Sequence, residues 1–317
     1  MNSNKVIVVA GPTAAGKTAL AISLAKAVGG EVISFDSMQV YQELSIATAR
    51  PTVEEMQGIP HHLIGFLSVR EPFSVADFKP LAEQTAKAVL SRGNVPIFVG
   101  GTGLYIDSLM QNIDFSARNH DEKVRRALEE ECRQKGIDCL FEKLRAVDPQ
   151  TAARLHKNNQ KRVLRALEVY LVTGKTMTQQ WQDSRKLKPI FDPLWIGVSC
   201  KDRAALYDRI NRRVDQMLQN GLLEEVRAYY AIEDVKTASQ AIGCKELKPY
   251  LDGEASLDMC VQQLKTETRR YAKRQLTWFK RNPQMHWLFV DTMEKDDLIQ
   301  AAVTLAKQHL EEKEWQD

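Results

Sequence analysis

The segment GPTAAGKT at residues 11–18 constrains the fold of this chain more than any other feature. It fits the pattern G-x-x-x-x-G-K-[ST], the phosphate-binding loop or P-loop, which joins a strand to a helix. The apolar run Val6–Ala10 precedes it, and apolar residues at helical spacing follow over Thr18–Val28. Because both flanks agree with the motif, the sequence predicts that the chain opens with a buried strand, a P-loop and a helix.

Strand and helix patterns then alternate. Glu31–Phe35 and Val95–Val99 are rich in β-branched residues and are bounded by Gly, Pro or Asp, which is typical of buried strands. Between them, Ala76–Leu90 has apolar residues at helical spacing. Such alternation indicates a parallel sheet. The predicted fold class is α/β, with a P-loop NTPase-like parallel sheet core.

The chemistry of the P-loop predicts a site for a di- or triphosphate. Gly11 and Gly16 permit backbone conformations that turn successive N–H groups inward, and the start of the helix adds partial positive charge. Lys17 contributes a full positive charge, and the Thr18 hydroxyl can ligate Mg²⁺. The predicted diphosphate- or nucleotide-binding residues are Gly11, Pro12, Thr13, Ala14, Ala15, Gly16, Lys17 and Thr18.

The sequence changes character after about residue 114. Residues 121–184 carry Glu, Lys, Arg, Ala and Leu at helical spacing, without a convincing strand. A helical block inserted into an α/β core is the simplest account. We expect a core domain of residues 1–114 and 190–317 and a helical insertion domain of residues 115–189. The later part of the core is predicted to contain strands at 194–200 and 286–290 and helices at 202–219 and 256–281.

Charge and cysteine content exclude several classes of protein. The 44 Lys and Arg residues against 41 Asp and Glu leave a net charge of +3, which alone does not establish a polyanionic partner. The five cysteines are scattered and form no C-x-x-C pair, which argues against a zinc finger and suits a reducing compartment. No stretch approaches the ~18 apolar residues of a membrane span. We therefore expect a cytoplasmic protein.

Two basic clusters are candidate nucleic-acid contacts. Residues 154–165 contain five Lys or Arg and no acid, and residues 265–281 contain seven with one acid. Basic stretches neutralise backbone phosphates, and aromatic side chains stack on exposed bases. Tyr271, Trp278 and Phe279 lie within the second cluster. The alternative for that cluster is a solvated helix face with its aromatic residues in the core.

One carboxylate is predicted beside the phosphates. A hydrolysing P-loop enzyme normally carries an acid at the end of a later strand, but the Val95–Val99 strand ends in two glycines. The acid here is Asp36, directly after Glu31–Phe35. Because the carboxyl ends of parallel strands open onto the same crevice, Asp36 should face the phosphates and can hold a metal or accept a proton. Alternatively, Asp36 only caps the following turn.

With these features in place, the chain resembles the bacterial tRNA dimethylallyltransferases, also called tRNA isopentenyltransferases. The resemblance covers nearly the whole chain in order. It rests on GPTAAGKT (11–18), ISFDSMQVYQELSIATARP (33–51), PHHL (60–63), ADF (76–78), VGGTGLY (99–105), RVLRALEVY (162–170), RINRRVDQML (209–218), AIGCKE (241–246) and TRRYAKRQLTWFKR (268–281).

The resemblance implies transfer of a dimethylallyl group from dimethylallyl diphosphate to N6 of the adenosine 3′ of the anticodon, in tRNAs that read codons beginning with U. It implies Mg²⁺ as cofactor and tRNA gripped between the core and the insertion. By resemblance, Asp36 is the base, Arg213 reaches the departing diphosphate, and Thr13 joins the catalytic group. From the residues alone, Arg209, Arg212 and Arg213 could be only solvated charges on one helix, since charged runs on helices usually face water.

The resemblance also implies a set of tRNA contacts. We expect a monomer that binds the anticodon stem-loop and dimethylallyl diphosphate, and no membrane. Cys244 stands where many relatives carry tyrosine, so it supplies no ring for base stacking. The implied tRNA-binding residues are Asp36, Ser37, Met38, Gln39, Thr102, Arg125, Lys161, Arg162, Val163, Leu164, Arg165, Gln240, Ala241, Ile242, Gly243, Cys244 and Lys245.

Three other functions remain open at the level of sequence. A P-loop small-molecule kinase would share the loop and the sheet but would use ATP as phosphoryl donor. A prenyltransferase acting on free adenine nucleotides would share the core motifs without needing an RNA grip. A non-catalytic RNA-binding protein could use the P-loop as a nucleotide switch. The missing acid after Val95–Val99 and the basic insertion disfavour the kinase.

Overall fold

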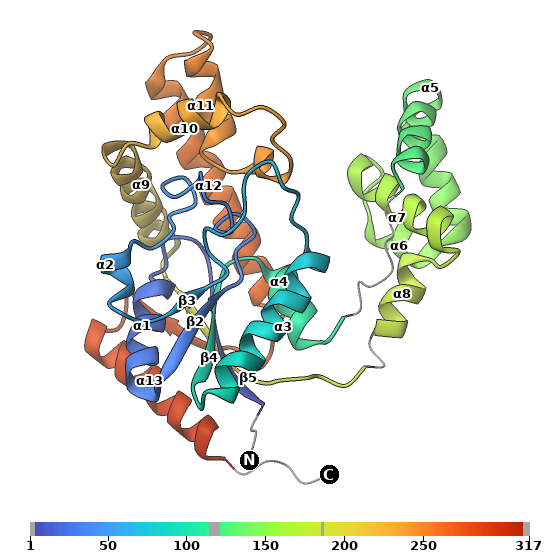
Figure 1. Ribbon diagram of the computed structural model, residues 1–317. Helices are drawn as coiled ribbons and strands as arrows, with labels where there is room; N and C mark the ends of the chain where they lie inside the picture. Colours follow the sequence, from blue (N-terminus) through green and yellow to red (C-terminus); the bar gives the residue numbers. More distant parts are fainter. Residues whose placement is uncertain (1–3, 114–120, 185–186, 313–317) are drawn as a thin grey trace. The chain divides into compact units, whose positions relative to one another are not determined.

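The computed structural model describes residues 4–113, 121–184 and 187–312 of the chain. The chain divides into two compact units, Met1–Leu109 with Phe191–Asp317 and Met110–Ile190. All of the described strands lie in the first unit, whereas the second is helical (Figure 1). The insertion expected from the sequence lies within the second unit.

A six-stranded parallel sheet forms the centre of the first unit, and it confirms the predicted α/β fold with a P-loop core. The strand order is β3-β2-β4-β1-β5-β6, and every neighbouring pair is parallel. Every residue of β1 is buried, because helices cover both faces of a central parallel strand. The strands are β1 (Lys5–Ala10), β2 (Gly30–Ser34), β3 (His61–His62), β4 (Val95–Gly100), β5 (Asp192–Ser199) and β6 (His286–Phe289).

Helices cover the sheet on both sides (Figure 1). On one side, Leu20 and Leu24 of α1 and Ala302 of α13 pack with Ile7 and Ile196 of the sheet in one apolar cluster. Helix α3 lies on the other side. The helices outside the second unit are α1 (Lys17–Val28), α2 (Val53–Met56), α3 (Val75–Ser91), α4 (Gly103–Met110), α9 (Arg203–Gln219), α10 (Leu222–Tyr230), the 3₁₀ helix η1 (Thr237–Gln240), α11 (Cys244–Leu251), α12 (Leu257–Phe279) and α13 (Lys295–Glu311).

The predicted core elements are present with small shifts at their ends, and several more elements appear. Strand β3 has two residues, too few for a periodic pattern. Helix α4 begins at Gly103 within a glycine-rich segment that favours a loop. Helix α13 buries Leu298, Ala302 and Ala306 at helical spacing, a signal that the sequence does contain.

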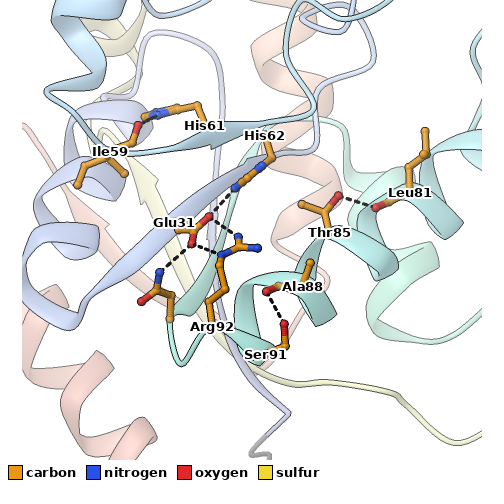
Figure 2. A network of polar contacts seen from close by, with 10 residues as sticks. Glu31, Ile59, His61, His62, Leu81, Thr85, Ala88, Ser91 and Arg92 are labelled. Atoms are coloured by element: carbon orange, nitrogen blue, oxygen red, sulfur yellow. Dashed lines mark hydrogen bonds and ion pairs between the residues drawn. The ribbon is translucent and has the colours of Figure 1, made fainter.

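A buried carboxylate ties β2 to its neighbours (Figure 2). Glu31 accepts hydrogen bonds from Arg92 Nε at 3.1 Å and Arg92 Nη2 at 2.7 Å, and from Asn94 Nδ2 at 2.7 Å. His62 Nε2 lies 2.6 Å from Glu31 Oε2. Hydrogen bonds from Arg92, Asn94 and His62 lower the pKa of Glu31 to about 2, against the effect of burial. The network joins β2, β3 and the turn between α3 and β4.

The second unit has its own apolar core, which includes Leu128, Leu140 and Leu167. Asp148 is buried and accepts hydrogen bonds from the N–H of Thr151 and from the N–H and hydroxyl of Thr178. It therefore caps α6 and also binds the first turn of α8. The helices of this unit are α5 (Glu122–Val147), α6 (Pro149–Arg154), α7 (Gln160–Thr173) and α8 (Met177–Ser184).

Candidate active site

The P-loop is tightly curled at the end of β1. Gly11 has φ 150°, and a Cβ atom there would lie 2.1 Å from the carbonyl oxygen of Val198, so no other residue fits. Gly16 has φ 94° and begins α1. The Lys17 ammonium folds back and donates to the carbonyl oxygen of Pro12 at 2.7 Å. Both glycines of the loop therefore adopt backbone conformations that favour glycine.

Side chains from α9 and α12 hold the middle of the P-loop. The N–H of Thr13 donates to Gln275 Oε1 at 2.9 Å, while Gln275 Nε2 donates to the carbonyl oxygen of Gly101 at 3.0 Å. Arg209 Nε donates to the carbonyl oxygen of Ala14 at 2.9 Å. Ala14 has φ 62°, a conformation that non-glycine residues adopt only when their surroundings hold them in it. The three contacts supply that restraint.

A cavity of about 220 Å³ opens beside the P-loop. Its lining comes from the P-loop, the segment after β2, the loop of residues 47–49, the end of β4, residues 241–242, and helices α9 and α12. From α9, Ile210, Arg213, Val214 and Met217 face the cavity, so one helix face supplies both a cation and apolar surface. The cavity therefore combines charged and apolar groups.

Asp36 both caps a turn and faces this cavity. Its Oδ1 atom accepts hydrogen bonds from the N–H groups of Met38 at 2.9 Å and Gln39 at 3.3 Å. Within the described part of the chain, Oδ2 has no hydrogen-bond partner, and Asp36 lines the cavity. The two alternatives drawn from the sequence are thus compatible, because Asp36 caps the turn through Oδ1 and also lines the cavity.

Two cations face the cavity together with Asp36. The pKa of the Lys17 ammonium is lowered to about 7, chiefly by burial and then by the positive charge of Arg213, while Asp36 acts in the opposite direction. Burial also lowers the pKa of the Arg213 guanidinium. Among the residues that the structure describes, Arg213 has no ion-pair or hydrogen-bond partner. A bound anion would neutralise both groups, so the site favours a phosphate.

The three arginines of α9 have different surroundings. Arg209 holds the P-loop, as described above, and Arg213 lines the cavity. Arg212 is exposed and forms an ion pair with Asp208 one turn earlier on the same helix. The solvated alternative is therefore correct for Arg212.

Helix α12 contributes three cavity residues, of which only Tyr271 was singled out from the sequence, as an aromatic residue within a basic cluster. Thr268, Tyr271 and Gln275 line the cavity from one face of the helix. Burial and the nearby Asp36 carboxylate raise the pKa of Tyr271, so its hydroxyl stays protonated and can donate. Phe279 is buried in the core, and Trp278 Nε1 donates to Asp107 Oδ2 at 2.7 Å. The core alternative is thus correct for Phe279, and Trp278 has a structural partner.

The expected tRNA contacts of the first unit are divided between cavity and core. Ser37, Met38, Gln39, Ala241 and Ile242 line the cavity. Thr102 lies next to them, because its hydroxyl accepts a hydrogen bond from the N–H of Ser37 at 3.2 Å.

The remaining residues of the 240–245 segment point in different directions. Gly243 and Cys244 are buried, and burial raises the pKa of the Cys244 thiol to about 12. The Cys244 side chain therefore belongs to the core and does not face RNA. Lys245 is exposed. The side chain of Gln240 lies outside the described part of the structure.

Of the expected tRNA contacts of the second unit, some are exposed and others are buried. Lys161 and Arg162 are exposed at the start of α7. Val163 and Leu164 are buried in the core of the unit, so their side chains are not available to RNA. The two arginines, Arg125 and Arg165, lie 3.7 Å and 3.1 Å from the buried carboxylate of Glu168.

No group of three or more His, Cys, Asp or Glu side chains that could hold a metal ion occurs in the described ranges. Thr18 and Asp36 both line the cavity and offer oxygen ligands. Mg²⁺ is commonly held by one or two protein oxygens plus substrate phosphates, and the Thr18 hydroxyl is an oxygen ligand of that kind beside the P-loop. Within the same ranges, no helix is long and apolar enough to cross a membrane.

Comparisons with known proteins agree with this geometry. A family model described as IPP transferase matches residues 39–282, and one described as isopentenyl transferase matches residues 4–70. The tRNA dimethylallyltransferase of Geobacillus thermodenitrificans is 47% identical over 295 residues, which cover 92% of this chain and 93% of that protein. That of Acetivibrio thermocellus is 47% identical over 298 residues, which cover 93% and 95%.

Solved structures show the same relationship. The tRNA isopentenylpyrophosphate transferase of Bacillus halodurans superposes with a TM-score of 0.73 and 41% identity, covering 98% of this chain and 97% of that one. A eukaryotic dimethylallyltransferase, studied in the act of modifying tRNA, superposes with a TM-score of 0.84 and 31% identity, covering 97% and 80%. The chain belongs to the IPP transferase family, which it shares with the tRNA dimethylallyltransferases.

Proposed function

We propose that the protein transfers a dimethylallyl group from dimethylallyl diphosphate to N6 of the adenosine 3′ of the anticodon, in tRNAs that read codons beginning with U. The observation that carries the proposal is the convergence of Lys17, Arg213 and Asp36 on one cavity. Two cations and a P-loop match a diphosphate, and a carboxylate beside them matches a nucleophile that must lose a proton.

The reaction exchanges one bond for another. The N6 atom forms a bond to C1 of the dimethylallyl group, the bond from C1 to the diphosphate oxygen breaks, and N6 loses a proton. In this proposal Asp36 Oδ2 accepts the proton, since Oδ1 is engaged by the turn. Lys17, Arg213 and the P-loop N–H groups stabilise the charge that grows on the departing diphosphate. Thr13 helps to orient it.

Mg²⁺ is part of the proposal. Thr18 would hold it with the substrate phosphates, and when bound it would add positive charge at the diphosphate. The chain itself would provide the orientation, because α9 and α12 fix the P-loop beside Asp36.

In this proposal, tRNA is bound by exposed cations and by residues at and beside the cavity. Lys161, Arg162 and Lys245 would neutralise phosphates of the anticodon stem-loop. Ser37–Gln39 and Thr102 would surround the adenosine once it leaves its stack, at a cost of a few kcal/mol. The proposal keeps the expected monomer and, because the substrate is tRNA, the cytoplasm as the place of reaction.

Mass spectrometry of tRNA nucleosides tests the proposal. The protein is incubated with Mg²⁺ and either dimethylallyl diphosphate plus tRNA, dimethylallyl diphosphate plus AMP, or ATP plus tRNA. We expect prenylated adenosine in the first reaction alone, at the position 3′ of the anticodon. Prenylated AMP without modified tRNA would favour the free-nucleotide prenyltransferase, and consumption of ATP without prenylation would favour a kinase or a nucleotide switch.

A further inference from the structure

Glu225 of α10 binds the backbone of the loop formed by residues 45–49. Its Oε2 atom accepts hydrogen bonds from the N–H and the hydroxyl of Ser45 and from the N–H of Ile46, each at 2.8 Å. Its Oε1 atom accepts from the N–H of Ala47 at 2.8 Å. Three successive N–H groups therefore converge on one carboxylate, the arrangement of an anion-binding nest. Hydrogen bonds to an ionised acceptor are strong, so this loop is firmly attached to α10.

The same loop is restrained on its other flank. Gln39 Nε2 donates to the carbonyl oxygens of Thr48 and Ala49, at 3.3 Å each. A Cβ atom built on Gly243 would lie 3.4 Å from the Cβ atom of Ala47, so that segment packs closely behind the loop. With Glu225 in place, the 45–49 loop has little room to move.

The restrained loop is a wall of the cavity. Ala47, Thr48 and Ala49 line it together with the apolar side chains of Val214 and Met217. The cavity volume of about 220 Å³ is small beside the ~300–1,000 Å³ of common small-molecule sites. A wall of small side chains on a fixed backbone therefore bounds one side of the cavity and limits the size of the ligand that fits beside it.

We propose that Glu225 is a positioning residue that fixes the 45–49 wall and thereby limits the length of the isoprenoid diphosphate that the protein accepts. The inference rests on the proposed function, because it assigns the wall to the isoprenoid rather than to the adenosine. Glu225 does not line the cavity, so it acts through the loop. Its contribution is to selectivity between prenyl donors of different length.

The substitution Glu225→Gln tests this geometry with little change in volume. Whichever way the amide is turned, an NH₂ group replaces one carboxylate oxygen and faces a backbone N–H donor. The loop then loses its anchor and can move away from the cavity. Dimethylallyl diphosphate is held less well, and geranyl diphosphate, which is one isoprene unit longer, gains space.

The experiment compares kcat/KM for dimethylallyl and geranyl diphosphate with an anticodon stem-loop as acceptor. For Glu225→Gln we expect kcat/KM for dimethylallyl diphosphate to fall about tenfold or more, chiefly through KM, as a displaced binding wall predicts. The ratio of geranyl to dimethylallyl activity should rise by at least about tenfold, equivalent to ~1.4 kcal/mol. Glu224→Gln is the matched control, because Glu224 is exposed and its nearest cation, Arg227, is 4.0 Å away. It should leave both values unchanged.

Ser45→Ala is the milder second variant, since it removes the hydroxyl hydrogen bond and keeps the three N–H bonds. It should shift the ratio in the same direction by a smaller factor, and it decides the question if Glu225→Gln does not fold. An unchanged ratio in the folded variants overturns the proposal, as does a rise in the KM for the stem-loop alone. Failure of the proposed function is a separate result, since the wild-type protein would then transfer no dimethylallyl group at all.

Discussion

Replacement of Asp36 by asparagine separates proton transfer from binding. The amide has almost the shape of the carboxylate, and its oxygen can still accept the N–H groups of Met38 and Gln39, so the turn should persist. The proton acceptor at the cavity is lost. A positioned general base contributes about 10²–10⁴ in rate, so we expect kcat to fall by that factor, or ~2.7–5.4 kcal/mol of transition-state stabilisation. tRNA affinity should change little.

The same substitution has a second, smaller consequence. Asp36 raises the pKa of Lys17, which is already lowered to about 7 by burial and by Arg213. Lys17 is cationic below its pKa, so loss of Asp36 should shift the loss of that charge to lower pH. The KM for dimethylallyl diphosphate should therefore begin to rise at a lower pH in Asp36→Asn than in the wild type.

Single-turnover transfer, tRNA binding and the pH profile of KM measure these effects. Asp208→Asn is a suitable control, because it removes the same charge from an exposed site on α9, where Asp208 pairs with Arg212. Normal turnover with a large loss of tRNA affinity would refute Asp36 as the base. An equal loss of rate in Asp208→Asn would show that net charge, and not the position of the carboxylate, is responsible.

Three further results are expected. Lys161→Ala should weaken tRNA binding and reduce the salt dependence of that binding by about one phosphate contact. Lys143→Ala is the control and should do neither, because the Lys143 ammonium already pairs with Glu131. An unchanged salt dependence in Lys161→Ala would remove Lys161 from the interface. In Gln275→Glu, the new carboxylate cannot donate to the carbonyl oxygen of Gly101 and adds negative charge beside the P-loop, so kcat/KM for dimethylallyl diphosphate should fall by roughly 10–100-fold. Wild-type kinetics in this variant would show that the hydrogen bonds of Gln275 are not needed. Glu31 has a folded-state pKa of about 2, below its usual value, so its network stabilises the fold above about pH 4.5 and this stabilisation is lost as the pH falls toward 2. In urea unfolding, Glu31→Gln should therefore lower the free energy of unfolding by roughly 3 kcal/mol at pH 7 and by little at pH 2. A difference that stays constant with pH would contradict this role.

Local sequence was enough to predict the P-loop, the parallel sheet and the position of Asp36. The P-loop and Asp36 follow from short motifs, and the parallel sheet follows from the alternation of strand and helix patterns along the chain. Gln275 and Glu225 could not be found in this way. Gln275 contacts Thr13 and Gly101, and Glu225 contacts Ser45, so their roles depend on packing between segments far apart in the chain.

In segments expected to contact tRNA, some side chains are exposed and others are buried, for a simple geometric reason. Residues 161–165 lie on α7, where successive side chains turn by about 100° around the axis. Such a run cannot face one partner throughout: Lys161 and Arg162 are exposed, while Val163 and Leu164 enter the core. The apolar residues Val163 and Leu164 within this basic segment were the sequence signal that part of it is buried. The proposed interface is accordingly narrower than the segment.

The end of β4 explains why the acid lies elsewhere in this protein. Strand β4 runs between β1, which leads to the P-loop, and β2, which leads to Asp36. Where a hydrolysing P-loop enzyme would carry an acid after this strand, the chain has glycine. A Cβ atom at Gly101 would lie 1.9 Å from Gln275 Nε2, so a side chain there would displace the Gln275 amide that holds the P-loop. An acid at this position is therefore incompatible with the hydrogen bonds that Gln275 makes here. The carboxylate therefore reaches the cavity from β2, beside the P-loop cations, where it can serve an incoming amine instead of a phosphate-directed water.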